Sequence, residues 1–288
     1  MTPLGLVKLP ALMELSAGRS DIAVGLIDGP VAVSNPDLAG NIREAPGGAA
    51  ACSRATSAAC LHGTFVAGIL CAKRGSIAPA VCPDCTLLIR PVFAENAAGN
   101  LDSPSAEPEE LAAAILACIE AGARVINLSL ALMQSSPPAR LALLQALDHA
   151  ARRGVLIVAV AGNQGAVGGT IITAHPWVVP VGACDLNGKP LNESNLGHSI
   201  GRRGLLAPGE QVTSLGNEGE PLTLGGTSAA APFVTGAIAL IWSLSPAASG
   251  ADVRLAILRA HARARTVTPP LLNAWAAYQV LLATHPRR

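Results

Sequence analysis

The chain has 288 residues, half of them apolar and only 2% aromatic, and its formal charge is +1. Without a block of Lys or Arg, this balance argues against a nucleic-acid partner. Pro232, Thr235 and Gly236 interrupt the longest apolar stretch, so we expect no membrane span, which needs about 18 apolar residues. Residues 1–10 carry one Lys and no signal-peptide pattern, which predicts a cytoplasmic protein.

In chain order, short apolar runs alternate with helical patterns. The first half predicts a strand at 22–27, a loop at 40–60, a helix at 63–72, a strand at 86–92, a helix at 109–121 and a strand at 124–130. The second half predicts a helix at 138–153, strands at 155–161, 177–184, 204–208 and 211–215, and helices at 228–244, 252–259 and 271–283. This alternation predicts a three-layer α/β fold, a parallel sheet covered by helices on both faces, in a single domain spanning residues 1–288.

Four polar residues stand at junctions between these elements. Asp28 ends the first strand, at the edge where open α/β sheets bind ligands. His62 opens a Gly-containing helix, and Ser228 begins the long apolar helix. A carboxylate can hold an imidazole in the tautomer that removes the proton of a serine hydroxyl. Asn163 follows the strand at 155–161 and offers an amide donor to an oxyanion, beside the backbone N–H of Ser228.

Each of these residues also has an ordinary structural explanation. Asp28 can be a turn residue, His62 a neighbour of a helix cap, Ser228 a helix N-cap and Asn163 a turn former. All four occur in one chain, in the order Asp, His, Asn, Ser, and each at the junction that catalysis needs. The pattern therefore predicts a catalytic triad of Asp28, His62 and Ser228 with Asn163 as the oxyanion donor.

Several sequence blocks resemble the subtilisin-like serine proteases. They are Val24-Gly-Leu-Ile-Asp28-Gly, His62-Gly-Thr-Phe-Val-Ala-Gly68, Val125-Ile-Asn-Leu-Ser-Leu130, Ala161-Gly-Asn163 and Gly226-Thr-Ser-Ala-Ala-Ala-Pro232. The resemblance implies about seven parallel strands and a serine endopeptidase without a cofactor or a metal in its chemistry. It also implies that the substrate peptide binds as an extended strand along Ser129, Leu130 and Ala131, with Ala161, Gly162 and Thr227 as further substrate contacts.

Three departures from that family bear on the substrate site and on metal binding. The family usually has Gly where Ala131 stands, which changes the first substrate pocket. The resemblance places the floor of that pocket in the segment after Asn163, around residues 168–173. The stretch between Gly68 and Ile77 is too short for the calcium loop of secreted members, and Asp37 has lost the companions of a calcium ligand. We therefore expect no metal.

A second resemblance concerns the proteases that mature cyanobactin-type ribosomal peptides. Asp28-Gly-Pro-Val and Ile89-Arg-Pro-Val-Phe93 look like their sequences. Macrocyclases of that group carry an insertion between Asp and His, and 34 positions leave no room for it here. The kinship predicts leader cleavage from a precursor peptide, in the company of other peptide-maturation enzymes. The alternatives are a general intracellular degradative peptidase and a peptide-binding pseudoprotease.

Seven cysteines leave the redox chemistry open. Cys82-Pro-Asp-Cys85 is a CxxC pair without the further ligands that a zinc site would need. Local disulfides between Cys82 and Cys85 or between Cys52 and Cys60 are one alternative, and free thiols are the other.

Overall fold

The computed structural model describes residues 1–39, 41–48, 51–54, 56–93, 95, 105–132, 136–261 and 266–285. Its centre is a sheet of seven strands in the order β2-β3-β1-β5-β7-β8-β9, with every neighbouring pair parallel. The strands are β1 (Ala23–Asp28), β2 (Ile42–Glu44), β3 (Thr86–Pro91), β5 (Ala123–Leu128), β7 (Leu156–Val160), β8 (Val179–Cys184) and β9 (Leu205–Pro208). The predicted fold class and strand number are confirmed.

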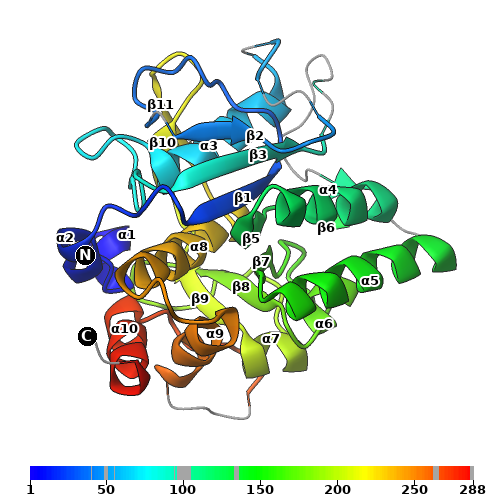
Figure 1. Cartoon of the computed structure of the whole chain (residues 1–288), viewed down its shortest axis with the longest axis vertical. Helices are drawn as coiled ribbons and strands as arrows, with labels where there is room; N and C mark the ends of the chain where they lie inside the picture. The colour runs from blue at the N-terminus through cyan, green and yellow to red at the C-terminus, as the bar shows by residue number, and fades with distance from the viewer. Residues whose placement is uncertain are drawn as a thin grey trace.

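Helices cover the sheet on both faces. On one face lie α4 (Pro108–Glu120) and α5 (Pro137–Arg153), drawn in green in Figure 1, and they pack on one of the apolar clusters. The other face carries α3 (Ala58–Cys71) and α8 (Thr227–Leu244), with α9 (Gly250–Arg259) and α10 (Ala274–Thr284) further out. Because both faces are covered, β1, β3, β7 and β8 are buried along their whole length, which explains why these strands are mostly apolar, with Asp28, Thr86 and Arg90 as the buried polar exceptions.

The helix α8 is the central element of the larger apolar cluster. It packs against β5, β7, β8 and β9 as well as α3. By length and composition alone it would pass for a membrane span, although 89% of it is buried inside the protein. A buried core helix has the same composition, and this is the position that the structure gives to α8.

The predicted loop at 40–60 is wrong at both ends. Its first part contains β2, and its last residues belong to α3, which begins at Ala58, five residues earlier than predicted. The Ser57 hydroxyl accepts a hydrogen bond from Cys60 N at 3.2 Å and so caps the helix. His62 consequently lies inside α3, in its second turn.

Several short elements were not predicted. They are α1 (Pro3–Leu6), α2 (Pro10–Leu15), α6 (Ile171–Ala174), α7 (His198–Arg203) and the two-stranded pair β4 (Ser105–Ala106) and β6 (Ala131–Leu132). The predicted strand at 211–215 is β10 (Val212–Leu215), which forms an antiparallel hairpin with β11 (Pro221–Leu224) outside the main sheet. Elements of two to six residues carry too little periodicity to be predicted from sequence.

Candidate active site

The structure brings Asp28 and His62 together at the carboxyl end of the sheet. His62 Nδ1 lies 2.6 Å from Asp28 Oδ1, and both side chains are buried. The same oxygen accepts the N–H of Gly29 at 2.6 Å. Because a carboxylate only accepts, the ring proton lies on Nδ1 and leaves Nε2 as the basic nitrogen. Burial acts to lower the pKa of His62, but the charge of Asp28 and the hydrogen bond to it outweigh burial and raise that pKa above its ordinary value.

Two glycines allow α3 to approach the end of β1 so closely. A Cβ on Gly63 would lie 2.4 Å from the carbonyl oxygen of Pro30. A Cβ on Gly29 would lie 2.0 Å from the carbonyl oxygen of Ala59. Since real side chains never come so near, any larger residue at either position would push His62 away from Asp28. The distance of 2.6 Å therefore depends on the Gly in both motifs.

Ser228 lies in the first turn of α8. Its hydroxyl is 3.4 Å from the carbonyl oxygen of Ser129, at the outer limit of a hydrogen bond, and its side chain is half-buried. The first N–H groups of a helix have no partner within the helix, so the backbone N–H of Ser228 is available to a ligand. The helix α3, which carries His62, packs against α8. Among the described residues no hydrogen bond joins Ser228 to His62, so proton transfer between them would require the hydroxyl to reorient, as catalytic contacts often tighten only with substrate bound.

Asn163 is anchored beside Ser228 through Thr227. Its Oδ1 accepts hydrogen bonds from Thr227 N and from Thr227 Oγ1, both at 2.9 Å. Within the described residues Nδ2 has no acceptor, so this amide N–H is the donor left for a substrate oxygen. Gly226, at φ +87°, packs against the amide, where a Cβ would lie 2.9 Å from Nδ2. The arrangement can present two N–H donors, Asn163 Nδ2 and Ser228 N, to an oxyanion.

The residues expected to contact substrate lie around this centre. Ser129, Leu130, Ala161 and Thr227 are buried, and Gly162 is half-buried. Ser129 and Thr227 touch the predicted catalytic residues directly, through the bonds to Ser228 and Asn163. Their roles toward a substrate stay predictions.

Ala131 begins β6, whose backbone pairs in parallel with β4, with Ser105 opposite Ala131. One edge of this segment is thus already occupied. Ser129 and Leu130 precede this pairing, so it does not occupy their backbone.

A buried polar network that the sequence analysis missed connects β5 to α8. Asn127 Nδ2 donates to Ser129 Oγ at 2.7 Å, and Thr235 Oγ1 donates to Asn127 Oδ1 at 2.8 Å. All three residues are fully buried. Satisfied networks of this kind fix relative positions inside a core. This one holds α8, and with it Ser228, in register with the backbone at Ser129.

The structure distinguishes between the disulfides and the free thiols that the sequence left open. Cys52 and Cys60 form a disulfide, whereas Cys82 and Cys85 are buried free thiols. The pKa of Cys82 is raised, chiefly by the neighbouring Cys71 thiol, so the CxxC pair lacks a reactive thiolate. A carboxylate oxygen of Glu95 lies within 4.8 Å of both disulfide sulfurs, a metal-ligand grouping, but the disulfide occupies both cysteines.

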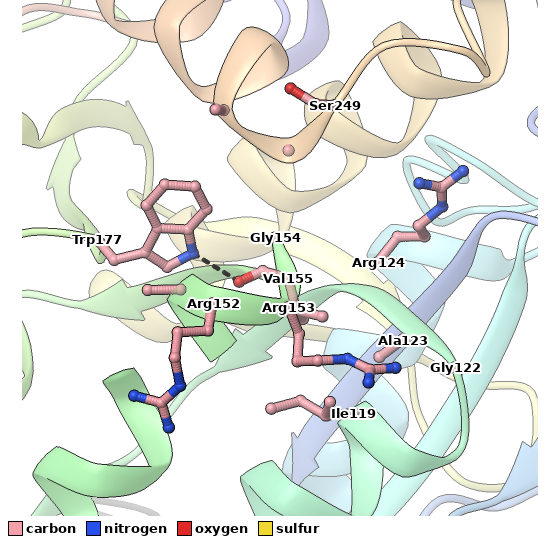
Figure 2. Close-up of a pocket in the computed structure, with 13 residues that line it drawn as sticks. Ile119, Gly122, Ala123, Arg124, Arg152, Arg153, Gly154, Val155, Trp177 and Ser249 are labelled. Carbon is pink, nitrogen blue, oxygen red and sulfur yellow. Dashed lines mark hydrogen bonds between the residues drawn. The ribbon is translucent and has the colours of Figure 1, made fainter. Parts of the chain in front are cut away.

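A hollow of about 600 Å³ lies at the amino ends of the strands, opposite the carboxyl ends where Asp28 is found. It is bordered by the amino ends of β5 and β7 and by the start of α9. Figure 2 shows the guanidinium groups of Arg124, Arg152 and Arg153 pointing in different directions, and the indole N–H of Trp177 bonded to Val155 O at 2.7 Å. The charges do not converge on one point, and the hollow lies at the amino ends of the strands, away from Asp28, so it is not part of the candidate active site.

Comparisons with known proteins give the class of this site. The model of the Subtilase family matches residues 19–274. Subtilisin DY of Bacillus licheniformis is 31% identical over 256 residues, covering 86% of this chain and 86% of its own length. Subtilisin NAT of Bacillus subtilis subsp. natto is also 31% identical, and the chain spans 62% of its length. The chain belongs to the subtilase family, and its class is that of the subtilisin-like serine endopeptidases.

Solved structures give a narrower likeness. A variant of the protease domain of PatA superposes with a TM-score of 0.81 at 29% identity, covering 94% of this chain and 98% of that one. The prenylagaramide maturation protease PagA gives 0.81 at 28%, covering 95% and 98%. The PatG macrocyclase, solved in complex with peptide, shares the fold with a TM-score of 0.80 at 22% identity. The predicted resemblance to maturation proteases is confirmed at the level of structure.

Proposed function

We propose that the chain hydrolyses peptide bonds through Asp28, His62 and Ser228, with Asn163 and the Ser228 N–H binding the oxyanion. The observation that carries this proposal is the buried pair of Asp28 and His62 at 2.6 Å. A buried carboxylate bonded to Nδ1 orients the ring and stabilises the imidazolium that forms when Nε2 takes a proton.

In this mechanism, Ser228 Oγ attacks the carbonyl carbon of the peptide and its proton passes to His62 Nε2. The C–N bond then breaks, and His62 returns that proton to the leaving amine. The acyl group stays on Ser228 as an ester. Water repeats the attack with the same base, which releases the acid and restores the serine. The developing charge on the carbonyl oxygen meets N–H donors that are already in place.

The substrate we propose is a ribosomally made precursor peptide whose leader is removed. PagA is by name a maturation protease, and the PatA protease domain shares the fold equally well. This proposal includes work beside other maturation enzymes and a cytoplasmic location. General degradation is the alternative that the family relationship supports.

Digestion of a peptide library, followed by mass spectrometry, separates these two functions. A maturation protease should cleave few members, at sites that share flanking residues. A degradative enzyme should cleave many peptides without a common flank. The Ser228→Ala variant is the control, and cleavage that persists in it belongs to a contaminant. A pseudoprotease would cleave nothing and would bind the same peptides in both forms.

A further inference from the structure

The loop that carries Asn163 is held in place by a distant segment of the same chain. It follows β7, and residues 163–170 are exposed. Gly162 and Gly165 have positive φ angles of +106° and +61°, which glycine adopts readily and other residues rarely adopt. An amide placed on such a loop would be mobile without support. Its support comes from residues 193–196, a segment more than two dozen positions further along the chain.

One side chain provides most of the contacts. The Nδ2 of Asn195 donates to Ala161 O at 3.1 Å and to Gln164 Oε1 at 2.7 Å. Its Oδ1 accepts from Gln164 N at 3.1 Å and from Ala166 N at 2.9 Å. Asn195 is half-buried, and these four bonds use both amide protons and both oxygen lone pairs.

Backbone hydrogen bonds between the two segments add to these side-chain contacts. Asn195 N donates to Gly162 O at 2.8 Å, and Gly165 N donates to Glu193 O at 2.7 Å. The residues directly before and after Asn163 are therefore both tied to one segment, while Asn163 itself is bonded to Thr227. A Cβ on Gly162 would lie 2.4 Å from Asn195 Nδ2, so the contacts of Asn195 also require glycine at position 162.

We propose that Asn195 is a positioning residue for the oxyanion site, acting through Asn163. It fixes the backbone on both sides of Asn163, so that Nδ2 stands where the substrate carbonyl develops its charge. A displacement of about 1 Å from a reacting group can cost a hundredfold in rate. The effect should appear in kcat, because the oxyanion exists only beyond the ground state. This inference rests on the proposed function.

The test is a double-mutant cycle on hydrolysis of a short chromogenic peptide anilide. Asn195→Ala should lower kcat by roughly tenfold to a hundredfold, with KM within about twofold. The isosteric Asn195→Asp keeps the two acceptor contacts but loses both donors, and it should give a smaller loss in the same parameter. In the Asn163→Ala background, Asn195→Ala should change kcat by less than about threefold, because the group through which it acts is gone.

Asn192→Ala is the matched control, an exposed Asn directly before residues 193–196, and it should leave kcat unchanged. An equal loss with and without Asn163, a change in KM alone, or unfolding of both Asn195 variants would each overturn the proposal. If the parent protein neither hydrolyses the anilide nor reacts with a fluorophosphonate, the proposed function itself fails. A reactive parent with an unaffected Asn195→Ala variant refutes the positioning role only.

Discussion

Replacing Asp28 by Asn should separate the two effects of the carboxylate on His62. The amide preserves the shape of the side chain but removes the charge and offers a donor group to Nδ1. For a substitution of this kind in a serine protease of a different fold, kcat drops by about 10⁴ because the imidazole adopts the wrong tautomer. We expect a similar loss here, equivalent to about 5 kcal/mol of transition-state stabilisation, since both side chains are buried and bonded at 2.6 Å.

The same variant should move the pH dependence. His62 acts as a base only when neutral, so its raised pKa places the acidic limb of kcat/KM above the ordinary histidine value of about 6.5. Without the Asp28 charge, burial remains as the main influence and lowers the pKa of His62. The acidic limb should therefore shift to lower pH in Asp28→Asn, while the plateau falls.

A kcat/KM profile from pH 4 to 9, measured with a peptide anilide, tests both expectations. The matched control is Asp148→Asn, since Asp148 lies 3.1 Å from His175 in a second Asp–His pair of the protein. That change should alter neither the plateau nor the limb. A shift of the limb to higher pH in Asp28→Asn, or a plateau within tenfold of the parent, would refute the assigned role of Asp28.

Four further outcomes follow from the structure. Asn163→Ala should lower kcat by roughly a hundredfold to a thousandfold, the range known for this donor in subtilisin, with little change in KM; an effect on KM alone would restrict Asn163 to a role in the turn. Reducing the Cys52–Cys60 disulfide should remove roughly 2.5 kcal/mol of stability for so short a loop, about 4 °C in Tm for a chain of this length. An unchanged Tm would show that the bond is not formed. Residues 164–174 contain no Asp or Glu to pair with a buried Lys or Arg of the substrate. The enzyme should therefore prefer substrates with a small or apolar residue directly before the scissile bond. A strict demand for Arg at that position in library cleavage would contradict this. The pKa of His62 is raised in the folded protein, so the stability that its protonation contributes should be complete below pH 6.5 and be lost as pH rises through the raised pKa. Urea titrations of the parent and of a His62→Gln variant measure this contribution. If the parent showed no such loss relative to the variant, the result would be inconsistent with the buried pair.

The disulfide also bears on the proposed location. Cytosolic thiols are generally kept reduced, and stable disulfides are typical of oxidising compartments. Alkylation of cell lysates under non-reducing conditions would show whether Cys52 and Cys60 are paired in the cell. A fully reduced pair is the result that agrees with a cytoplasmic enzyme, and it would mean that the protein works without this bond.

The sequence predicted the sheet and pointed to Asp28, His62 and Ser228 as candidate catalytic residues, because both are local signals. The apolar run before Asp28 is continuous since β1 is buried on both faces, and the Gly-rich blocks around His62 and Ser228 have few other uses. What the sequence left open are contacts between distant segments. The choice of Cys52 and Cys60 over Cys82 and Cys85 depends on how α3 packs against the segment before it.

Asn195 illustrates the same limit. In the sequence it is one Asn in a polar stretch, typical of a loop. Its four side-chain bonds exist only because the chain returns beside Ala161–Ala166 after β8. Asn127 and Thr235 are likewise polar residues inside apolar runs, and a buried polar residue in such a run is a signal that could have been used.

In the proposed mechanism Ser228 is an activated nucleophile. The most direct measurement is the reaction of the protein with a fluorophosphonate probe, followed by peptide mapping in a mass spectrometer. We expect one covalent adduct, on Ser228, that is absent from Ser228→Ala and forms far more slowly in His62→Ala. An adduct on another residue, or no adduct on a folded protein, would contradict it.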